Sequence, residues 1–384
     1  MQMKYDYIIT GSGCAGLSLL YSILKDPSLK TKKILVIDKN KDKTNDRTWC
    51  YWEKGEGLFE PIVTHQWKEL EFISSNFFRR FKLEHYSYKM IRGIDFYNFV
   101  LEFTKGSENV TFISENINRI SVINECATVE TESNKYFAKY VFNSTNLFNP
   151  QINPHNSLLQ HFEGWFIKTN KQCFDHHIGT LMDFRLSQEL GATFMYVLPT
   201  QPNEALIEYT LFSKNILERD KYKLALENYI KDNLKIEEYE ITHKEYGVIP
   251  MSMASFARNA NSEKRIINIG TAGGFTKASS GYTFQFIQKN TNAIVTNLRK
   301  GVSPNPKITF REKMFQWYDK VLLEVLISQK MTAKEIFSMM FKKIEPEKIL
   351  SFLGNESSFI DDIRIMNSVP KKINFFIAGI RRLK

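Results

Sequence analysis

One carboxylate stands in the middle of an apolar, strand-like run, ALIEYTLFS at residues 205–213. Burial within such a strand would make ionisation of Glu208 costly, so the side chain would keep its proton and could act as an acid. The alternative is a strand residue that points outward into solvent and has no chemical role. The other motifs of the chain decide between these two interpretations.

A glycine-rich motif, GSGCAG, places Gly11, Gly13 and Gly16 between an apolar strand pattern and a helical pattern. The next apolar run ends on Asp38. In this setting the first glycine allows a tight turn, the second lets the backbone approach a pyrophosphate, and the third lets helix and strand pack closely. The helix N-terminus offers free N–H groups to phosphates, and Asp38 would accept hydrogen bonds from a ribose. The motif predicts a bound dinucleotide, either NAD or FAD.

A second glycine-rich turn, IINIGTAGG at 266–274, follows a late apolar strand and precedes a helical pattern. Flavoproteins of the hydroxylase-like type need such a return to close over the flavin, so this turn favours FAD. The helix is expected to begin near Ser280 with Ser279 and Ser280 as caps, and its positive end would stabilise an anionic reduced flavin. The residues of the turn expected to border the cofactor are Gly270, Thr271, Gly273 and Gly274.

The segment NDRTWCYWE, residues 45–53, follows the expected ribose-binding position and should lie near the cofactor. Arg47 could pair with a phosphate or with the flavin, and the two tryptophans could flank the flavin ring. Glu53 could be a second acid or base, or a partner for Arg47. A packed aromatic turn without chemical function is the alternative for each of these residues.

Other polar residues have less specific settings. Asp183 in TLMDFR could be an active-site carboxylate or could cap a turn. His176 and His177 have no third ligand nearby, and the four cysteines lack the spacing of metal ligands, so we expect no metal site. We interpret these cysteines as reduced thiols.

The elements that would hold these residues alternate between strand and helix in the first 40 residues and are mainly strand-like up to residue 270. A charged helical pattern covers 216–235, and amphipathic helices follow Pro304 and Pro306. The N-terminus leads directly into a strand, so we expect no signal peptide, and no run of 18 apolar residues predicts a membrane span.

Charge is concentrated at the C-terminal end. The formal net charge is +10, and residues 299–384 hold 17 Lys and Arg against 9 Asp and Glu, a net +8. No DNA- or RNA-binding motif is present, so we expect no nucleic-acid partner. An anionic membrane surface is one partner that would suit this region, with Met339, Met340 and Phe341 beside Lys342 and Lys343 as the contact. A solvated basic helical face is the alternative.

Several blocks together resemble one family, the bacterial lycopene β-cyclases, which are flavin-dependent carotenoid cyclases. The most specific are NDRTWCYWE at 45–53 and IGTAGGFTKASSGYTF at 269–284. The others are DYIITGSGCAGLSL at the start, IRGIDFY (91–97), TLMDFR (180–185), FMYVLP (194–199), IEYT (207–210) and YGVIPM (246–251). The resemblance extends over nearly the whole chain.

The resemblance implies an intramolecular lyase that converts the linear ψ ends of lycopene, by way of γ-carotene, into the β rings of β-carotene. The cofactor would be reduced FAD with NAD(P)H as electron source, and Arg92 in IRGIDFY would join the cofactor-binding residues. The acidic signature of the family maps onto Glu208 as the proton donor, and Tyr209 stands where the second acidic residue would be. Gly270-Thr271 stands where related flavoproteins often have Gly-Asp. Localisation would be cytoplasmic, on the inner face of the cell membrane.

The expected fold class is therefore α/β: a Rossmann-like FAD-binding domain of the hydroxylase-like type, a mixed-sheet substrate domain and a C-terminal helical region. A flavin-dependent monooxygenase or reductase acting on an isoprenoid is the alternative function, and a carotenoid-binding protein is a third. The sequence leaves the oligomeric state open. The expected domains are 1–62, 91–150 and 262–300 for FAD, 63–90 and 151–261 for substrate, and 301–384 for the helical region.

Overall fold

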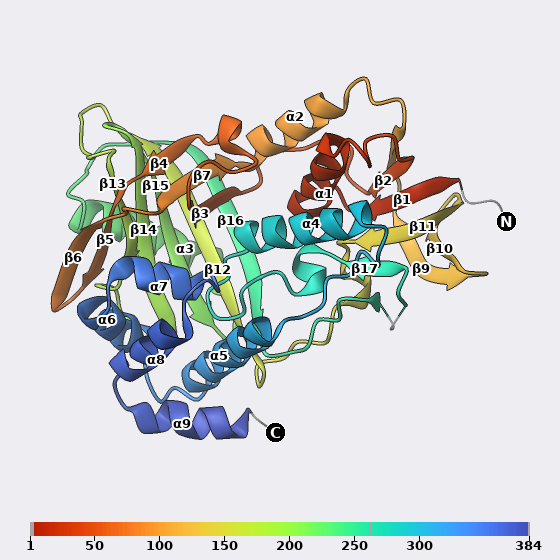
Figure 1. Cartoon of the computed structure of the whole chain (residues 1–384). Coiled ribbons are helices and arrows are strands. Elements are labelled where there is room, and N and C mark those ends of the chain that lie inside the picture. The colour runs from red at the N-terminus through yellow and green to blue at the C-terminus, as the bar shows by residue number, and fades with distance from the viewer. Residues whose placement is uncertain (1–3, 261–262, 383–384) are drawn as a thin grey trace.

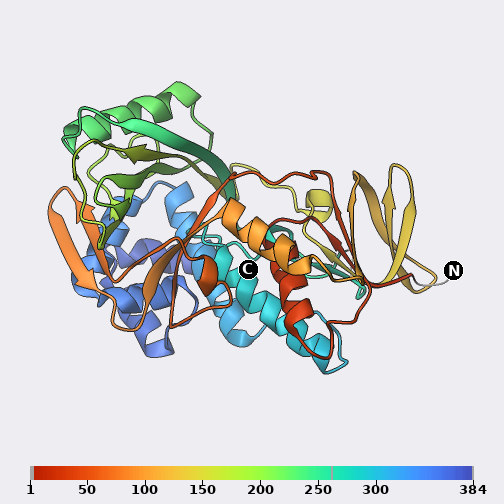
Figure 2. The same ribbon diagram turned by 90° about the horizontal axis from the view of Figure 1, so that it is seen from above.

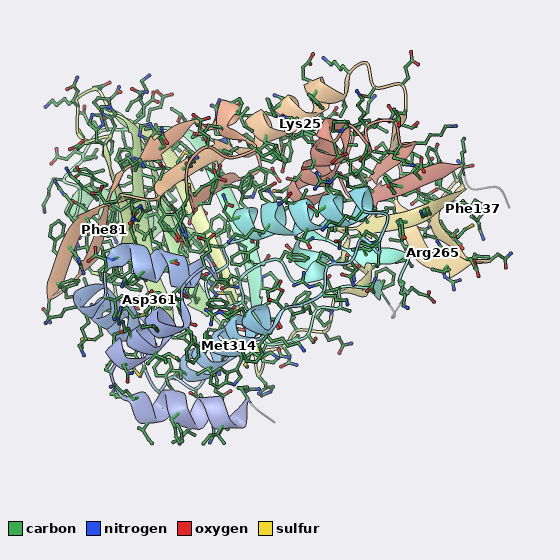
Figure 3. The ribbon with its side chains drawn as sticks, viewed as in Figure 1. Lys25, Phe81, Phe137, Arg265, Met314 and Asp361 are labelled. Atoms are coloured by element: carbon green, nitrogen blue, oxygen red, sulfur yellow. The ribbon has the colours of Figure 1, made fainter. Side chains whose placement is uncertain are left out.

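The computed structural model describes residues 4–260 and 263–382. The outermost residues of the expected first and last domains, and the boundary at 261–262, lie outside this range. Two seven-stranded sheets, a three-stranded sheet and a group of C-terminal helices make up the fold (Figure 1). The two large sheets lie at opposite ends, where Phe137 and Phe81 mark them in Figure 3. The expected α/β class is confirmed.

The first large sheet contains the expected dinucleotide-binding unit. Its strands β8, β2, β1, β11 and β17 pair in parallel, and β10 and β9 continue the sheet in antiparallel fashion. Ile8 and Ile9 on neighbouring positions of β1 are both fully buried, as expected for a parallel strand covered on both faces. The strands are β1 Tyr5–Thr10, β2 Ile34–Asp38, β8 Val110–Ser114, β9 Ile117–Ile123, β10 Cys126–Thr131, β11 Lys135–Asn143 and β17 Ile266–Asn268.

The second large sheet is mixed and runs in the order β16-β12-β15-β14-β13-β5-β6. Helix α3 covers one face, and the C-terminal helices lie on the other (Figure 2). Because side chains alternate along a strand, each strand sends one residue toward α3 and the next toward the opposite face. The strands are β5 Glu69–Ser74, β6 Phe77–Lys82, β12 Ser157–Lys168, β13 Ile178–Asp183, β14 Ala192–Gln201, β15 Glu204–Ser213 and β16 Glu240–Ser252.

The small sheet joins the two halves of the molecule. Cys50 and Trp52 on β3 pack toward the second large sheet, whereas Trp49 and Tyr51 pack toward α1 and α4. The elements are β3 Thr48–Glu53, β4 His65–Trp67 and β7 Ser87–Arg92, with helices α1 Cys14–Lys25, α2 Gly93–Thr104, α3 Arg219–Asp232 and α4 Phe284–Arg299. Helix α4 begins at Phe284 with Thr283 as N-cap residue, so the expected start near Ser280 and the capping role of Ser279 and Ser280 are wrong.

Five helices form the C-terminal layer: α5 Phe310–Ile327, α6 Ala333–Lys343, α7 Pro346–Leu353, α8 Phe359–Ser368 and α9 Lys372–Arg381. A buried network ties this layer to the loop before α4. Lys277 Nζ donates to Asp319 Oδ1 on α5 and to Asn355 Oδ1, both at 2.7 Å. Ser279 Oγ also donates to Asp319 Oδ1 at 2.7 Å. The loop that precedes α4 is therefore held in place by the C-terminal helices.

The exposed apolar residues of this layer differ from the expected ones. Met340 is 5% exposed and Phe341 is fully buried, with its ring stacked on Phe72 of β5, so the expected contact through these two residues is wrong. Apart from Phe310 at the start of α5, the exposed large apolar side chains of this layer instead lie on α8 and α9. We call them the docking face: Phe359, Ile360, Ile363, Met366, Ile373, Phe376, Ile377 and Ile380.

A cavity of about 370 Å³ opens among the C-terminal helices beside the docking face. Its lining is mainly apolar and includes Trp317, Leu322, Phe337, Met340, Met366 and Phe376.

Over residues 4–260 and 263–382, none of the helices combines the length and the apolar character needed to cross a bilayer.

Candidate active site

The turn between β1 and α1 has the geometry that the glycine motif predicts. Gly11 has a φ of +94°, and a Cβ added to Gly16 would lie 2.0 Å from the carbonyl oxygen of Gly11. Both positions therefore require glycine for the backbone itself. A Cβ on Gly13 would meet nothing within 4 Å. The open space at the helix N-terminus fits a pyrophosphate, as the cofactor would need.

Asp38 lies at the end of β2 beside this turn. Its Oδ2 accepts hydrogen bonds from Ser12 N and Ser12 Oγ, both at 2.6 Å, and from Lys43 Nζ at 3.2 Å. Burial acts to raise the pKa of Asp38, but the hydrogen bonds from Ser12 and Asn40 outweigh it and hold this pKa below its ordinary value. The side chain stays an ionised acceptor at the position expected for a ribose.

The second glycine-rich turn meets the first. Gly270–Gly273 forms a short 3-10 helix, and a Cβ on Gly270 would lie 2.8 Å from the Cβ of Ala15 in α1. Thr271, Gly273 and Gly274 border a cavity of about 310 Å³. Glycine turns from opposite ends of the sequence thus come together at the start of α1, as closure over one cofactor requires.

The two arginines expected at the cofactor already have carboxylate partners. Arg47 Nη2 lies 2.6 Å from Asp46 Oδ2, and the guanidinium is near Cys14 at the start of α1. Arg92 forms an ion pair with Asp95 in the first turn of α2, at 2.6 Å. Arg47 is therefore the better placed of the two for a cofactor phosphate.

Glu208 lies on the face of the second large sheet that looks toward the small sheet. Its neighbours include Cys50, Tyr88, Tyr196 and Tyr282. Glu208 Oε1 accepts a hydrogen bond from Thr210 Oγ1 at 2.7 Å. Burial raises the pKa of Glu208 to about 7, because the carboxylate form loses its hydration in this apolar setting.

Aromatic rings border this half-buried carboxyl group. The hydroxyl oxygens of Tyr196 and Tyr282 lie 3.3 Å apart. Trp52 meets Tyr282 edge-to-face with ring centroids 4.5 Å apart. Tyr282 precedes α4, so the loop held by the C-terminal helices contributes directly to the wall of the site.

A second carboxylate, Glu245, lies on the same face and was not predicted from the sequence. It belongs to β16, is 5% exposed and sits beside Glu208. Burial, followed by the negative charge of Glu208, raises the pKa of Glu245 to about 8. The one sequence signal was its place directly before the block YGVIPM in an alternating strand.

The structure does not bring Glu53 to this group. Glu53 Oε2 lies 3.0 Å from Lys89 Nζ, and its Oε1 accepts a hydrogen bond from Gln285 Nε2 at 3.0 Å. On β3 its side chain lies on the face of Trp49 and Tyr51, away from Cys50 and Trp52. These contacts make Glu53 an ion-pair partner of the buried Lys89.

Asp183 and Tyr209 point to the α3 face of the sheet, opposite to Glu208. Tyr229 on α3 donates a hydrogen bond to Asp183 Oδ2 at 2.6 Å, and Arg185 Nη2 lies 2.5 Å from the same oxygen. Tyr209 packs in the apolar cluster beneath α3. The residue beside Glu208 in sequence therefore cannot pair with it, whatever its chemical type.

We expect Asp183→Asn to cost about 2 kcal/mol of unfolding free energy, because Arg185 loses its charged partner and the buried hydroxyl of Tyr229 a charged acceptor. Any activity that depends on the opposite face of the sheet, where Glu208 lies, should not change in the folded protein. Urea unfolding measures the first effect, with Asp220→Asn on exposed α3 as the control expected to stay within about 0.5 kcal/mol. Loss of activity at unchanged stability would instead make Asp183 a catalytic residue.

Comparison with known families decides the classification. The family model "Lycopene cyclase protein" matches residues 6–377. The chain belongs to the lycopene cyclase family. A search among curated proteins finds no match.

Solved structures show that this lycopene cyclase family member has a flavoprotein fold. A geranylgeranyl bacteriochlorophyll reductase-like protein from Thermoplasma acidophilum has a TM-score of 0.62 at 13% identity, covering 98% of this chain and 99% of its own. A flavoprotein/dehydrogenase from Cytophaga hutchinsonii has a TM-score of 0.61 at 14% identity, with coverage of 98% and 99%. The flavin-dependent brominase Bmp2 has a TM-score of 0.55 at 12% identity, covering 91% and 93%. The expected fold type is confirmed.

Proposed function

We propose that this protein is a lycopene β-cyclase, which closes β rings on the linear ends of lycopene without net oxidation or reduction. The observation that supports this most directly is the position of Glu208: a half-buried carboxyl group with a raised pKa, bordered by aromatic rings, in a member of the lycopene cyclase family. An alkene is a weak base, so its protonation requires an uncharged acid in a dry site.

The proposed reaction balances in protons. The carboxylic acid of Glu208 gives its proton to C2 of the ψ end, and a tertiary cation forms at C1. The C5=C6 double bond attacks C1, which closes the six-membered ring and moves the cation to C5. Loss of the C6 proton to a carboxylate gives the β ring and restores the acid. The rings of Trp52, Tyr196 and Tyr282 can stabilise the cations without acting as nucleophiles.

We propose FAD as the cofactor, because the residues at the two glycine turns fit it. Gly13 and the N-terminus of α1 would receive the pyrophosphate, Asp38 the ribose, and Arg47 a phosphate, while the turn at 270–274 would close over the flavin. Reduced FAD, when bound, would supply a negative charge that can stabilise a carbocation. NAD(P)H is the proposed source of its electrons.

The function is tested by expressing the chain in lycopene-producing bacteria and separating the pigments by chromatography. A cyclase gives β-carotene by way of γ-carotene, with unchanged mass, and it also works anaerobically with reduced FAD. A product heavier by two hydrogens would identify a reductase, and one that contains oxygen a monooxygenase. Unchanged lycopene under all conditions would contradict an enzymatic function.

We further propose that the enzyme works on the inner face of the cell membrane, because lycopene dissolves in the bilayer. The docking face supports this proposal: Ile360, Ile373 and Phe376 are 62%, 61% and 65% exposed. Basic residues accompany them: Arg364 and Arg381 have largely exposed side chains, which form ion pairs with Asp361 and Glu324. Apolar side chains would enter the headgroup region, and the basic groups would attract anionic lipid.

Vesicle binding tests this surface. We expect the double variant Ile373→Ser and Phe376→Ser to bind vesicles with 30% anionic lipid at least tenfold more weakly than the parent chain, since about 250 Å² of apolar surface is no longer buried. Leu224→Ser is the matched control, because Leu224 is 58% exposed on α3, on the other side of the second sheet. Equal sedimentation of all three proteins with vesicles would exclude this face as the membrane-binding surface.

A further inference from the structure

Glu208 and Glu245 reach the same space from two strands that are not neighbours. Strand β12 lies between β15 and β16, and Gly164 on β12 is the register partner of both residues. Two strand spacings separate their Cα atoms by about 10 Å, which is within the combined reach of two glutamate side chains. Because Gly164 has no side chain, nothing from β12 stands between them.

The contacts around Gly164 also show the direction in which the side chain of Glu245 extends. A Cβ built on Gly164 would be 3.1 Å from Cγ of Glu245 and 3.3 Å from its Oε1. The side chain of Glu245 therefore extends across the glycine rather than away from it. The neighbouring Leu206 on β15 approaches the same point, also at 3.1 Å, so an added methyl group would require Glu245 or Leu206 to shift by a few tenths of an ångström.

Glu245 is buried, and hydrogen bonding from Thr48 only partly offsets the cost of a charge there. Its Oε2 has no hydrogen-bond partner among residues 4–260 and 263–382. The acidic groups that act on it are Glu208 and Asp46, and His243 is two positions away along β16. Facing the pair from other elements are Cys50 and Thr48 on β3, Tyr88 on β7, Tyr196 on β14 and Tyr282 before α4. Among residues 4–260 and 263–382, no lysine or arginine is a main cause of either pKa shift.

We propose that Glu245 is the partner carboxylate of Glu208, and that the two share one proton above Gly164, which keeps the acid of the cyclisation loaded at neutral pH. The catalytic part of this inference rests on the proposed function. Glu245 acts through Glu208 and is thus a positioning residue for the proton. After Glu208 has protonated C2, its carboxylate can receive the proton that leaves C6, so the pair returns to its starting state. The second acid of the site comes from β16, since Tyr209 faces the other way.

The inference has a consequence for stability that does not depend on any substrate. The pair has raised pKa values, about 7 and about 8 against 4.5 for free glutamic acid. Groups with a raised folded-state pKa stabilise the fold fully below the unfolded pKa, and this contribution is lost as pH rises through the folded pKa. The folded protein should therefore lose stability between about pH 4.5 and pH 8.

The test compares Glu245→Gln with the parent chain and with Glu240→Gln, the same change at an exposed position of β16. Unfolding midpoints of the FAD-loaded proteins are measured from pH 5 to pH 9. We expect the midpoint of Glu245→Gln to fall distinctly less over this range than that of the parent, and the midpoint of Glu240→Gln to follow the parent. Parallel curves for all three would overturn the inference.

The pH profile of cyclisation is the second readout. With Glu245 in place the two carboxyl groups titrate together, and the negative charge of one raises the pKa of the other. This charge is absent in Glu245→Gln, so the alkaline limb of its pH profile should lie at lower pH than that of the parent. Gly164→Ala shifts the side chain of Glu245 but keeps its carboxyl group. The alkaline limb of its pH profile should therefore also move to lower pH. An unmoved limb in both variants would overturn the catalytic part. If the unfolding curves differ as expected but the parent chain forms no β-carotene, the shared proton is supported and the proposed function is contradicted.

Discussion

Replacing Glu208 by glutamine is expected to lower the rate of cyclisation by about 10³-fold while FAD stays bound, because the amide keeps the shape of the side chain but has no proton to give to an alkene. Lycopene should accumulate in place of β-carotene. Chromatography of the pigments measures the product, and flavin absorbance of the purified protein measures the bound cofactor.

The control for this variant is Glu204→Gln on the same strand, where the carboxylate lies 3.2 Å from Lys168 Nζ and is partly exposed. It should cyclise at the parent rate. A Glu208→Gln protein that still formed β rings would remove Glu208 from the role of acid and leave the mechanism without its first step.

Gly13→Ala should fold like the parent chain and lose FAD affinity by about 100-fold. The added methyl group meets no protein atom within 4 Å, and Gly13 has a φ of −84°, which alanine adopts freely. The methyl group would occupy the space through which a pyrophosphate approaches the backbone. Titration with FAD, followed by flavin fluorescence, gives the affinity, and thermal unfolding without FAD gives the stability.

Gly16→Ala provides the contrast, because its methyl group would lie 2.0 Å from the carbonyl oxygen of Gly11 and should destabilise the fold itself. The two glycines of one motif thus separate cofactor binding from folding. Tight FAD binding by the Gly13→Ala protein would show that the cofactor does not approach this turn.

Local patterns predicted the first half of the nucleotide-binding unit well. Strand, glycine turn, helix and Asp38 follow each other within about 35 residues, and each is determined by neighbours in sequence. Strand β15 was predicted for the same reason, as an apolar run bounded by turn residues. Strand alternation also implies that Glu208 and Tyr209 face opposite ways. Only the packing of α3 determines which of them lies on the face toward the small sheet.

Strands β12 and β16 were not predicted, and with them Glu245 was missed. Gln160, His161, Glu163 and Gly164 interrupt the apolar pattern of β12. Strand β16 lies at the edge of its sheet, where Pro250 and several charged residues are tolerated. The proximity of Glu245 to Glu208 arises from pairing across β12, which no local pattern reveals.

The exposed face of the C-terminal region was equally inaccessible to sequence reasoning. The pattern indicated amphipathic helices, but Met340 and Phe341 are covered because α6 packs on β5, β6 and β14. An amphipathic helix identifies its apolar stripe but not its partner. Only the arrangement of α8 and α9 at the outer side of the layer leaves their apolar residues free.

The link between Lys277 and Asp319 has a consequence for how the molecule could be shortened. Lys277 is buried, and its ammonium group has its acidic partner on α5. A chain cut before α5 would keep the entire flavoprotein core in its sequence. It would, however, leave the buried ammonium group of Lys277 without its acidic partner and release the loop that holds Tyr282. The helices from α5 onward are thus no detachable anchor: the segment proposed to bind lipid also holds the loop that places Tyr282 beside Glu208.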